Sequence, residues 1–227
     1  WRLRKADPFL ARLFNGLFRP KRVNILGFEL SGIVEETGSG VSKFQKGDAI
    51  VAYCGLKFGA YAEFKCFSED EIIVKKPAAL SFDEAAAIPV GGGTALKMLQ
   101  KIKSGSGKKI LVYGASGSVG TYSVQLAKHF GFHVTGVCSG QNSELVKSLG
   151  SDVVIDYTTQ DIASTDNRFD AIIDAVGKLP LSNLKKLLLP KGQIVSVRGR
   201  YKIEQKDLNF LGQLAEKRIL KPVIDRK

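Results

Sequence analysis

The chain has 227 residues, 44% of them hydrophobic, so it is long enough for one large or two small domains with a sizeable core. Its apolar runs are short and broken by Gly or charge, which argues against a membrane-spanning helix, and its 34 Lys and Arg against 22 Asp and Glu make it strongly basic. The three cysteines show no C-x-x-C spacing, which favours a reducing, cytoplasmic compartment.

The first 26 residues are especially basic, with Asp7 as the only acid and with apolar side chains interleaved. Such a segment could form an amphipathic helix on an anionic membrane surface, or contact RNA, although Pro8 and Gly16 interrupt it. The alternative is that the charge serves solubility and attracts a phosphorylated cofactor. We favour this alternative because no nucleic-acid-binding motif accompanies the charge.

Short strand-like runs alternate with turn signals up to about residue 80, at residues 32–36, 47–53, 60–64 and 72–74. This pattern is typical of a β-rich domain. Ser81 then has the features of a helix N-cap, since Asp83 and Glu84 follow it in what would be the first turn. A second helix is expected over residues 94–103.

Strand-like and helix-like patterns alternate from residue 109 onward. The expected strands cover residues 109–113, 133–138, 152–156, 170–175 and 192–198, and the expected helices cover residues 118–130, 142–149, 181–189 and 207–218. Strands separated by helices imply right-handed crossovers between parallel strands. The order therefore predicts an α/β fold with a Rossmann-type, doubly wound parallel sheet beside the β-rich domain.

The most informative stretch joins the first of these strands to the helix after it. The apolar run 110–113 stops at a glycine-rich turn, and a helical pattern follows at once. A dinucleotide-binding unit needs this order, because glycine lets backbone N–H groups approach a pyrophosphate at the helix N-terminus. Ala115 stands where the G-x-G-x-x-G fingerprint has its first glycine, and an ordinary strand-to-helix turn is the alternative. The residues predicted to bind the cofactor here are Ala115, Ser116, Gly117, Ser118, Val119 and Gly120.

The second strand of the sheet bears on which nicotinamide coenzyme would bind. An NAD-binding unit has an acid at the end of this strand, whose carboxylate binds the ribose 2′-OH. Here the strand runs into Ser139 and Asn142, with no acid before Glu144. A hydroxyl and an amide can donate to a 2′-phosphate that a carboxylate would repel, so NADPH is favoured over NADH. The alternative is that Ser139 and Asn142 only cap the next helix.

Seven segments carry a common family pattern, at residues 25–35, 41–48, 58–63, 76–78, 84–89, 93–96 and 220–225. Together they resemble the zinc-independent quinone oxidoreductase branch of the medium-chain dehydrogenase/reductase superfamily, which is alcohol dehydrogenase-like in fold. The resemblance implies three parts: a GroES-like catalytic domain over 1–90, truncated at its N-terminus, a Rossmann NADP-binding domain over 91–218, and a return toward the catalytic domain over 219–227. It also implies a homodimer, formed through the sheet edge near 192–198.

The resemblance further implies NADPH-dependent hydride transfer to quinones or α,β-unsaturated carbonyls. Zinc-dependent relatives have a His where this chain has Phe28, and the four closely spaced Cys of their structural-zinc loop have no counterpart, so we expect no zinc. Without a metal, alcohol oxidation loses its usual means of stabilising an alkoxide, whereas a quinone or enone accepts hydride with less help. Two other functions stay open: an alcohol dehydrogenase, and a non-catalytic NADPH-binding protein associated with RNA or a membrane surface.

Matching the chain to the family residue by residue implies further site residues. Ser139, Asn142 and Tyr157 would bind the 2′-phosphate end of NADPH, although relatives often have Lys at the position of Asn142. Tyr53 ends a strand of the catalytic domain and could donate a hydrogen bond to a substrate oxygen, or only pack.

The nicotinamide end has its own set of implied residues. These are Thr94, the pair Val176 and Gly177, and the run Val197, Arg198 and Gly199. The alternatives are a helix cap at Thr94 and a plain strand-end turn at Gly177.

Overall fold

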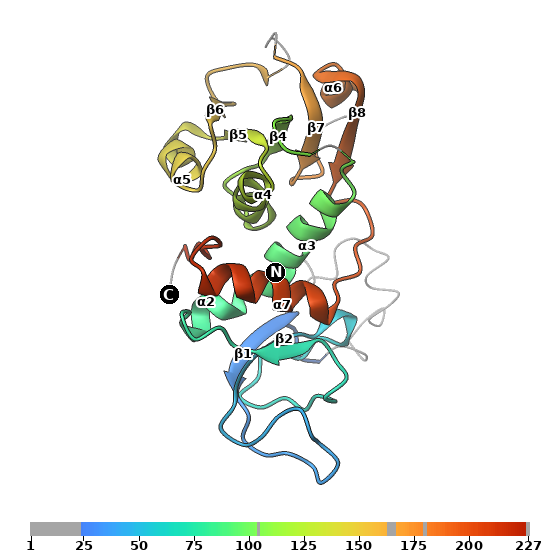
Figure 1. Cartoon of the computed structure of the whole chain (residues 1–227), viewed down its shortest axis with the longest axis vertical. Helices are drawn as coiled ribbons and strands as arrows, with labels where there is room; N and C mark the ends of the chain where they lie inside the picture. The colour runs from blue at the N-terminus through green and yellow to red at the C-terminus, as the bar shows by residue number, and fades with distance from the viewer. Residues whose placement is uncertain (1–23, 104, 163–166, 179–180, 226–227) are drawn as a thin grey trace. The chain divides into compact units, whose positions relative to one another are not determined.

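The computed structural model describes residues 24–103, 105–162, 167–178 and 181–225 (Figure 1). No helix in these ranges is long and apolar enough to cross a membrane, and the three cysteines are free. Packing divides the chain into two units between Lys75 and Lys76. The sequence placed the domain boundary after residue 90, whereas the residues from Lys76 onward pack with the second unit.

Three antiparallel strands form the sheet of the first unit, in the order β1–β2–β3. They are β1 (Glu29–Ile33), β2 (Ala49–Tyr53) and β3 (Ile73–Lys75), and the short 3-10 helix η1 (Gly55–Lys57) follows β2. Ile50, Ala52 and Ile73 form a buried cluster, against which Phe44 and Phe67 pack. This cluster is the core of the first unit.

Residues 60–64, which the sequence predicted as a strand, do not form one. The N–H groups of Ala60 and Tyr61 donate to the carbonyls of Gly27 and Leu26, at 3.4 and 2.8 Å, and neither of these acceptors belongs to a strand. Alternating apolar residues are therefore not sufficient for a strand, because a strand also needs a neighbouring strand for its ladder.

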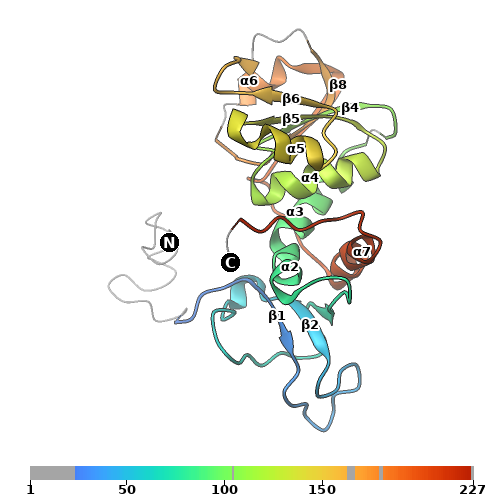
Figure 2. The same ribbon diagram turned by 90° about the vertical axis from the view of Figure 1, so that its left-hand side faces the viewer.

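A five-stranded parallel sheet forms the centre of the second unit, in the order β6–β5–β4–β7–β8 (Figures 1 and 2). The strands are β4 (Lys109–Tyr113), β5 (His133–Cys138), β6 (Val153–Asp156), β7 (Phe169–Asp174) and β8 (Leu188–Ser196). Helices α4 (Ser118–His129) and α5 (Ser143–Ser148) pack on β4 to β6, and α6 (Leu181–Lys185) packs on β8. The predicted Rossmann-type order is confirmed.

The strand order reverses between β4 and β7. From β4 the chain passes outward through β5 to β6, and it then crosses to the other side of β4 to form β7 and β8. The carboxyl ends of β4 and β7 meet at Tyr113 and Asp174, which are paired in register. Open α/β sheets bind ligands outside the carboxyl ends of their strands at such a switch point.

Helix α3 (Ile88–Gln100) begins earlier than the sequence predicted, and it contains three consecutive glycines before Thr94. Glycine costs about 1 kcal/mol relative to Ala in a helix interior. Here a Cβ on Gly91 would lie only 2.6 Å from the Ser118 Oγ of α4. The glycines therefore let α3 pack closely on its neighbours, and this packing outweighs the local propensity.

Helices α2 and α7 carry capping boxes. Ser81 caps α2 (Phe82–Ala86) through reciprocal hydrogen bonds with Glu84, as the sequence predicted. In α7 (Gln205–Glu216), the carboxylate of Asp207 accepts from the backbone N–H of Glu204 at 2.7 Å and lies 3.0 Å from the Lys97 ammonium of α3. The Asp207 side chain is 2% exposed, so this ion pair ties α3 to α7 largely out of water.

The sequence predicted a helix over residues 181–189. Helix α6 ends at Lys185 instead, and strand β8 begins at Leu188. Leu184 and Leu187 are buried in the core under the sheet. A short apolar run that is buried in this way fits a helix or a strand equally well, and periodicity alone cannot separate the two.

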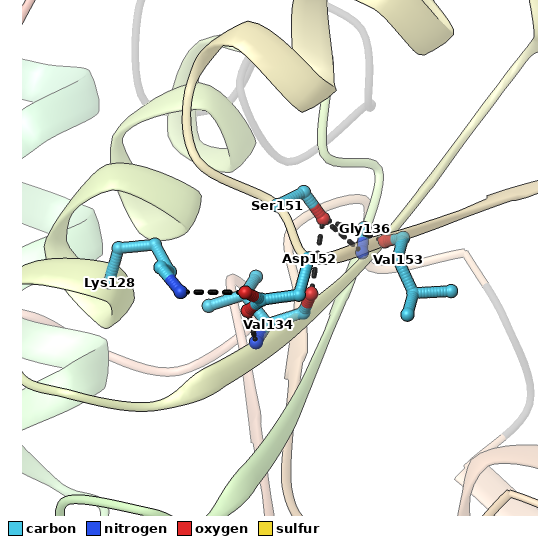
Figure 3. A network of polar contacts seen from close by, with 6 residues as sticks. All are labelled: Lys128, Val134, Gly136, Ser151, Asp152 and Val153. Carbon is cyan, nitrogen blue, oxygen red and sulfur yellow. Dashed lines mark hydrogen bonds and ion pairs between the residues drawn. The ribbon is translucent and has the colours of Figure 1, made fainter.

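A polar network holds the start of β6 beside β5 (Figure 3). The hydroxyl of Ser151 accepts from the N–H of Gly136 at 2.9 Å and donates to the carbonyl of Val134 at 3.2 Å. The carboxylate of Asp152 accepts from the N–H of Val134 at 2.7 Å and from the Lys128 ammonium of α4 at 2.8 Å. The network fixes the register of the two strands, and therefore where their carboxyl ends lie.

Candidate functional site

The turn from β4 to α4 is compact and lies at the switch point of the sheet. The N–H groups of Gly114 and Ala115 both donate to the carbonyl of Val137 on β5, at 3.0 and 2.9 Å. Gly114 has a φ of +82°, and a Cβ on Gly120 would overlap the Gly114 carbonyl. These two glycines let the first turn of α4 lie against the end of β4, which brings the helix N-terminus to the carboxyl edge of the sheet.

The outer side of this turn is open. Gly117 is exposed and is the N-cap of α4, and a Cβ there would meet only the Gly114 carbonyl oxygen, at 3.5 Å. The N–H groups in the first turn of a helix have no acceptor within the helix, and they carry partial positive charge. The turn therefore offers bare backbone donors to an anion.

The other residues predicted from the fingerprint divide into buried and accessible ones. Ala115 and Gly120 are buried, so they shape the turn and can contact a ligand only through their backbone. Ser116 and Val119 are half-buried, and Ser118 is exposed. The structure thus brings the predicted set into one turn.

Ser139 and Asn142 lie together in the loop after β5, which contains the short 3-10 helix η2 (Gly140–Asn142). The Asn142 amide donates to the Ser139 hydroxyl at 3.0 Å. Neither side chain hydrogen-bonds to the backbone at the start of the helix that follows it. The alternative in which they only cap the next helix is therefore wrong for their side chains.

The sequence analysis missed Asp156, an acid that borders this loop. Asp156 ends β6 and is the register partner of Cys138 at the end of β5. Its Oδ1 accepts from the N–H and the hydroxyl of Thr158, at 2.9 and 2.7 Å, and a Cβ on Gly140 would overlap its Oδ2. Hydrogen bonds from Thr158 and Gly140 hold the pKa of Asp156 below its ordinary value, so it is anionic at neutral pH. Parallel register, rather than chain order, brings this acid to the loop.

Tyr157 follows β6 and lines a hollow of about 440 Å³, together with Tyr113 and the segment up to Ile162. The Tyr157 side chain is 54% exposed, and its N–H donates to the Cys138 carbonyl at 3.1 Å. Burial, with smaller contributions from Tyr157 and Asp174, raises the pKa of Tyr113 and keeps its hydroxyl protonated. The hollow therefore presents two phenol side chains next to the end of β5.

The loops after β7 and β8 build the other side of the switch point. Gly177 has a φ of +71°, which makes it a strand-end turn, and its carbonyl accepts from the Arg198 Nε. The N–H of Val197 donates to the Asp174 carbonyl at 3.0 Å. Val197 is half-buried, while Arg198 and Gly199 are exposed. The two loops are therefore joined to each other as well as to their strands.

Val176, in the loop after β7, contacts the glycine-rich turn after β4. Its side chain is 40% exposed, and a Cβ on Gly114 would overlap it. The loop after β7 therefore lies directly against the turn after β4. The predicted residues of the β7 and β8 loops and those of the glycine-rich turn are in one region of the second unit.

Asp174 is a second acid that the sequence analysis missed. It ends β7 and is 1% exposed, and its carboxylate accepts hydrogen bonds from Val176, Gly177 and Ser196. A usable signal was present, since Asp174 is a single acid directly after the apolar run Ala171–Ile173. A polar residue at the carboxyl end of a buried parallel strand points to the binding edge of the sheet.

Thr94 and Tyr53 have different surroundings. Thr94 is half-buried inside α3, so the alternative in which it caps a helix is wrong. Tyr53 ends β2 in the first unit, whereas every predicted cofactor-binding residue is in the second. Burial, and then the nearby Glu29 and Cys54, raise the pKa of Tyr53, so its hydroxyl stays protonated at neutral pH and can donate a hydrogen bond.

Phe28, which stands where zinc-dependent relatives have a His, packs against a second aromatic ring. The ring centroids of Phe28 and Phe58 lie 4.6 Å apart, and Phe58 is 4% exposed with a φ of +53°. The N–H of Cys54 donates to the Phe28 carbonyl at 2.6 Å. Within the part of the chain that the structure describes, no group of three or more His, Cys, Asp or Glu side chains is placed to hold a metal ion.

Two family models match the chain. The model of the zinc-binding dehydrogenases matches residues 118–221, and that of the alcohol dehydrogenase GroES-like domain matches residues 7–78. A chloroplast envelope quinone oxidoreductase homolog of Arabidopsis thaliana is 39% identical over 210 residues, which are 87% of this chain and 61% of that protein. A chloroplastic NADPH-dependent alkenal/one oxidoreductase of the same plant is 31% identical over 219 residues, 88% of this chain and 56% of that protein. The chain therefore spans less than two thirds of the length of these relatives.

A solved structure agrees with these matches. The quinone oxidoreductase of Coxiella burnetii has a TM-score of 0.85 and 28% identity to this chain, covering 99% of this chain and 77% of that protein. The likeness extends over both units.

Proposed function

The chain belongs to the medium-chain dehydrogenase/reductase superfamily and is quinone oxidoreductase-like, and from this premise we propose that it serves NADPH-dependent reduction of quinones or α,β-unsaturated carbonyls. The names of its relatives support this substrate class, since they include a quinone oxidoreductase homolog and an alkenal/one oxidoreductase.

The observation that carries the proposal is the glycine-rich turn at the switch point of the sheet. Gly114 and Gly120 allow α4 to start at the carboxyl edge, and the open Gly117 leaves backbone donors accessible. A bridging diphosphate fits such a cradle, because it is compact and anionic and needs close backbone approach. These residues would hold the diphosphate of the coenzyme.

Two side chains favour NADPH over NADH, and one carboxylate opposes it. The adjacent side chains of Ser139 and Asn142 can donate to a 2′-phosphate, and one relative is named as NADPH-dependent. The anionic Asp156 beside the same loop would repel that phosphate. We propose that NADPH is preferred, but that Asp156 makes the preference smaller than it would otherwise be.

The chain's own residues would bind and orient the reactants. Bound nicotinamide coenzyme supplies a hydride to an electron-poor carbon. The turn after β4 holds the coenzyme, and the loops after β7 and β8 fix its reactive end, which is mainly catalysis by positioning. The protonated hydroxyl of Tyr53 is our candidate donor to a substrate oxygen. Phe28 and Phe58 offer no metal ligand, so we propose that the reaction needs no zinc.

The test is direct. We expect the purified protein to quench or shift NADPH fluorescence on binding, with weaker binding of NADH, and to oxidise NADPH only when 1,4-benzoquinone or a simple enone is added. A metal chelator should leave the rate unchanged. A protein that binds neither coenzyme would contradict the proposal, and a rate lost on chelation would favour the zinc alcohol dehydrogenase instead.

Two further expectations stay proposals. They are a homodimer formed through the sheet edge near residues 192–198 and a cytoplasmic location. Association of the basic N-terminal segment with a membrane or RNA is the alternative that the sequence favours less. The basic residues 1–23 lie outside the described residues. Sedimentation at two protein concentrations tests the dimer, and salt-dependent binding to anionic vesicles tests the membrane association.

A further inference from the structure

Asp174 is a buried carboxylate with no cationic partner. Its side chain is 1% exposed, and among the described residues no Lys, Arg or His forms an ion pair with it. A charge taken out of water without a counter-ion is costly, unless hydrogen bonds compensate it. The donors that compensate Asp174 therefore indicate what this carboxylate is for.

The groups that donate hydrogen bonds to this carboxylate lie at the end of β8 or in the loop after β7. Its Oδ1 accepts from the N–H groups of Val176 and Gly177, at 3.2 and 2.8 Å, and its Oδ2 accepts from the Ser196 hydroxyl at 2.8 Å. The Ser196 hydroxyl in turn accepts from the N–H of Arg198 at 3.3 Å, and the Arg198 Nε donates to the Gly177 carbonyl. One carboxylate thus fixes two loops relative to each other.

The location of these loops indicates which half of a dinucleotide they would meet. The diphosphate lies at the N-terminus of the helix after β4, and the adenosine ribose lies at the end of the next strand, β5, in units of this kind. The remaining half must therefore extend to the other side of the switch point, over β7 and β8. Asp174 is paired in register with Tyr113 at the end of β4, so it stands at this crossing.

We infer that Asp174 is a positioning residue for the nicotinamide half of the coenzyme. It acts by holding the β7 and β8 loops in one fixed arrangement, and it does not itself touch the reacting atoms. The inference rests on the proposed function, since it presupposes that a nicotinamide coenzyme binds at this edge.

The experiment compares two ligands that share the adenosine half. NADPH has the nicotinamide half, whereas 2′,5′-ADP lacks it. In Asp174→Asn an amide N–H₂ replaces one acceptor, so one of the loop donors loses its bond, and we expect the Kd for NADPH to rise about tenfold. The Kd for 2′,5′-ADP should not change. Titration calorimetry measures both, independently of turnover.

Two further variants make the result interpretable. Ser196→Ala removes only the link to the second loop, and we expect a smaller rise in the Kd for NADPH with 2′,5′-ADP binding again unchanged. Asp170→Asn is the matched control, because Asp170 lies on the same strand at its amino end and accepts from the N–H of Lys109 at 2.9 Å. It should bind both ligands like the parent protein. If Asp174→Asn fails to fold, Ser196→Ala decides the question.

The outcomes separate the inference from the function on which it rests. Equal weakening of NADPH and 2′,5′-ADP would mean general damage and would overturn the inference, as would unchanged binding of both ligands. A parent protein that binds neither ligand would instead refute the proposed function. A second readout is the face selectivity of hydride transfer: we expect the parent to transfer deuterium from one face of C4-labelled NADPH, and Asp174→Asn to lose part of that selectivity.

Discussion

The glycines of one short motif have different physical roles. Gly120 is required by packing, since a Cβ there would overlap the carbonyl of Gly114. Gly117 is not, because it has room for a side chain and a φ of −83°, which any residue adopts. A substitution at Gly117 can therefore alter the charge of the site without straining the fold.

This difference makes it possible to test whether a diphosphate binds at this turn. Gly117→Asp places a carboxylate at the N-cap of α4, where Asp is a favoured cap, so the free energy of unfolding should not fall. The same carboxylate would repel a diphosphate, and we expect the Kd for NADPH to rise by a factor of about ten or more. Fluorescence titration and urea unfolding measure the two effects.

Gly117→Asn is the matched control, because it has nearly the same shape and is an equally good cap without charge. It should bind NADPH much more tightly than Gly117→Asp does. If the Asp variant binds as well as the Asn variant, the diphosphate does not lie at this turn.

Asp156 gives the second test at this scale. Its charge opposes a 2′-phosphate but not the 2′-hydroxyl of NADH, so Asp156→Asn should raise the ratio of the NADH Kd to the NADPH Kd. Asp156 is only half-buried, so water and salt screen its charge, and we expect a change of roughly threefold. The ratio is informative because any disturbance of the loop, such as a lost hydrogen bond from Gly140, affects both coenzymes alike. An unchanged ratio would remove Asp156 from coenzyme choice.

Among the elements, α3 is the helix whose formation depends most on packing against its neighbours. Its glycine run disfavours a helix locally, and its packing on α4 and α7 compensates. The Lys97–Asp207 pair is part of this compensation, because it joins α3 to the first turn of α7. Burial alone would lower the pKa of Lys97, but Asp207 and Glu204 together raise it, so the ammonium stays charged.

Breaking this pair from one side should destabilise the second unit. Lys97→Met leaves the carboxylate of Asp207 buried without its cation, and we expect the free energy of unfolding to fall by about 3 kcal/mol in urea titrations. Lys206→Met removes the exposed partner of Glu204 and should lower the free energy of unfolding much less, because water screens this ion pair. Equal effects of the two variants would show that burial of the Lys97 pair does not matter.

At the scale of the whole molecule, both units contain carboxylates that are held in their charged form. In the first unit, the N–H of Gln45 and the side chain of Lys75 lower the pKa of Asp48. In the second, burial alone would raise the pKa of Asp152, but hydrogen bonds from Lys128 and Val134 outweigh it and the pKa is lowered. Acid should therefore weaken both units.

The direction of the pH dependence follows from linkage. The folded pKa of Asp152 lies below its ordinary value of 3.8, so the unfolded chain takes up the proton more readily. The stabilisation is complete above about pH 5, and it is lost as the pH falls through the folded pKa. We expect thermal unfolding to shift to lower temperature between about pH 5 and 3, and Asp152→Asn to shift less over that range. An equally steep loss in the variant would assign the acid lability to other carboxylates.

The alternation of strands and helices, the glycine-rich turn and the cap at Ser81 were predictable from the sequence, because each depends on residues close together in the chain. The helical state of Gly91 and its neighbours was not, since it depends on close packing against α4. The early start of β8 also depends on tertiary structure, because an apolar run can be buried as helix or strand. Likewise, residues 60–64 have the pattern of a strand but lack a strand partner.

The sequence by itself determined the fold class and the turn that would bind a diphosphate, because periodicity and the backbone freedom of glycine are local properties. The family came from the resemblance of seven short segments to a known pattern. Only the tertiary structure decided which acids border that site. Asp156 reaches the Ser139 loop through the parallel register of β6 with β5, and Asp174 reaches the end of β4 through the crossover to β7. Both juxtapositions join residues far apart in the chain, and strand order and register, which no local pattern encodes, create them.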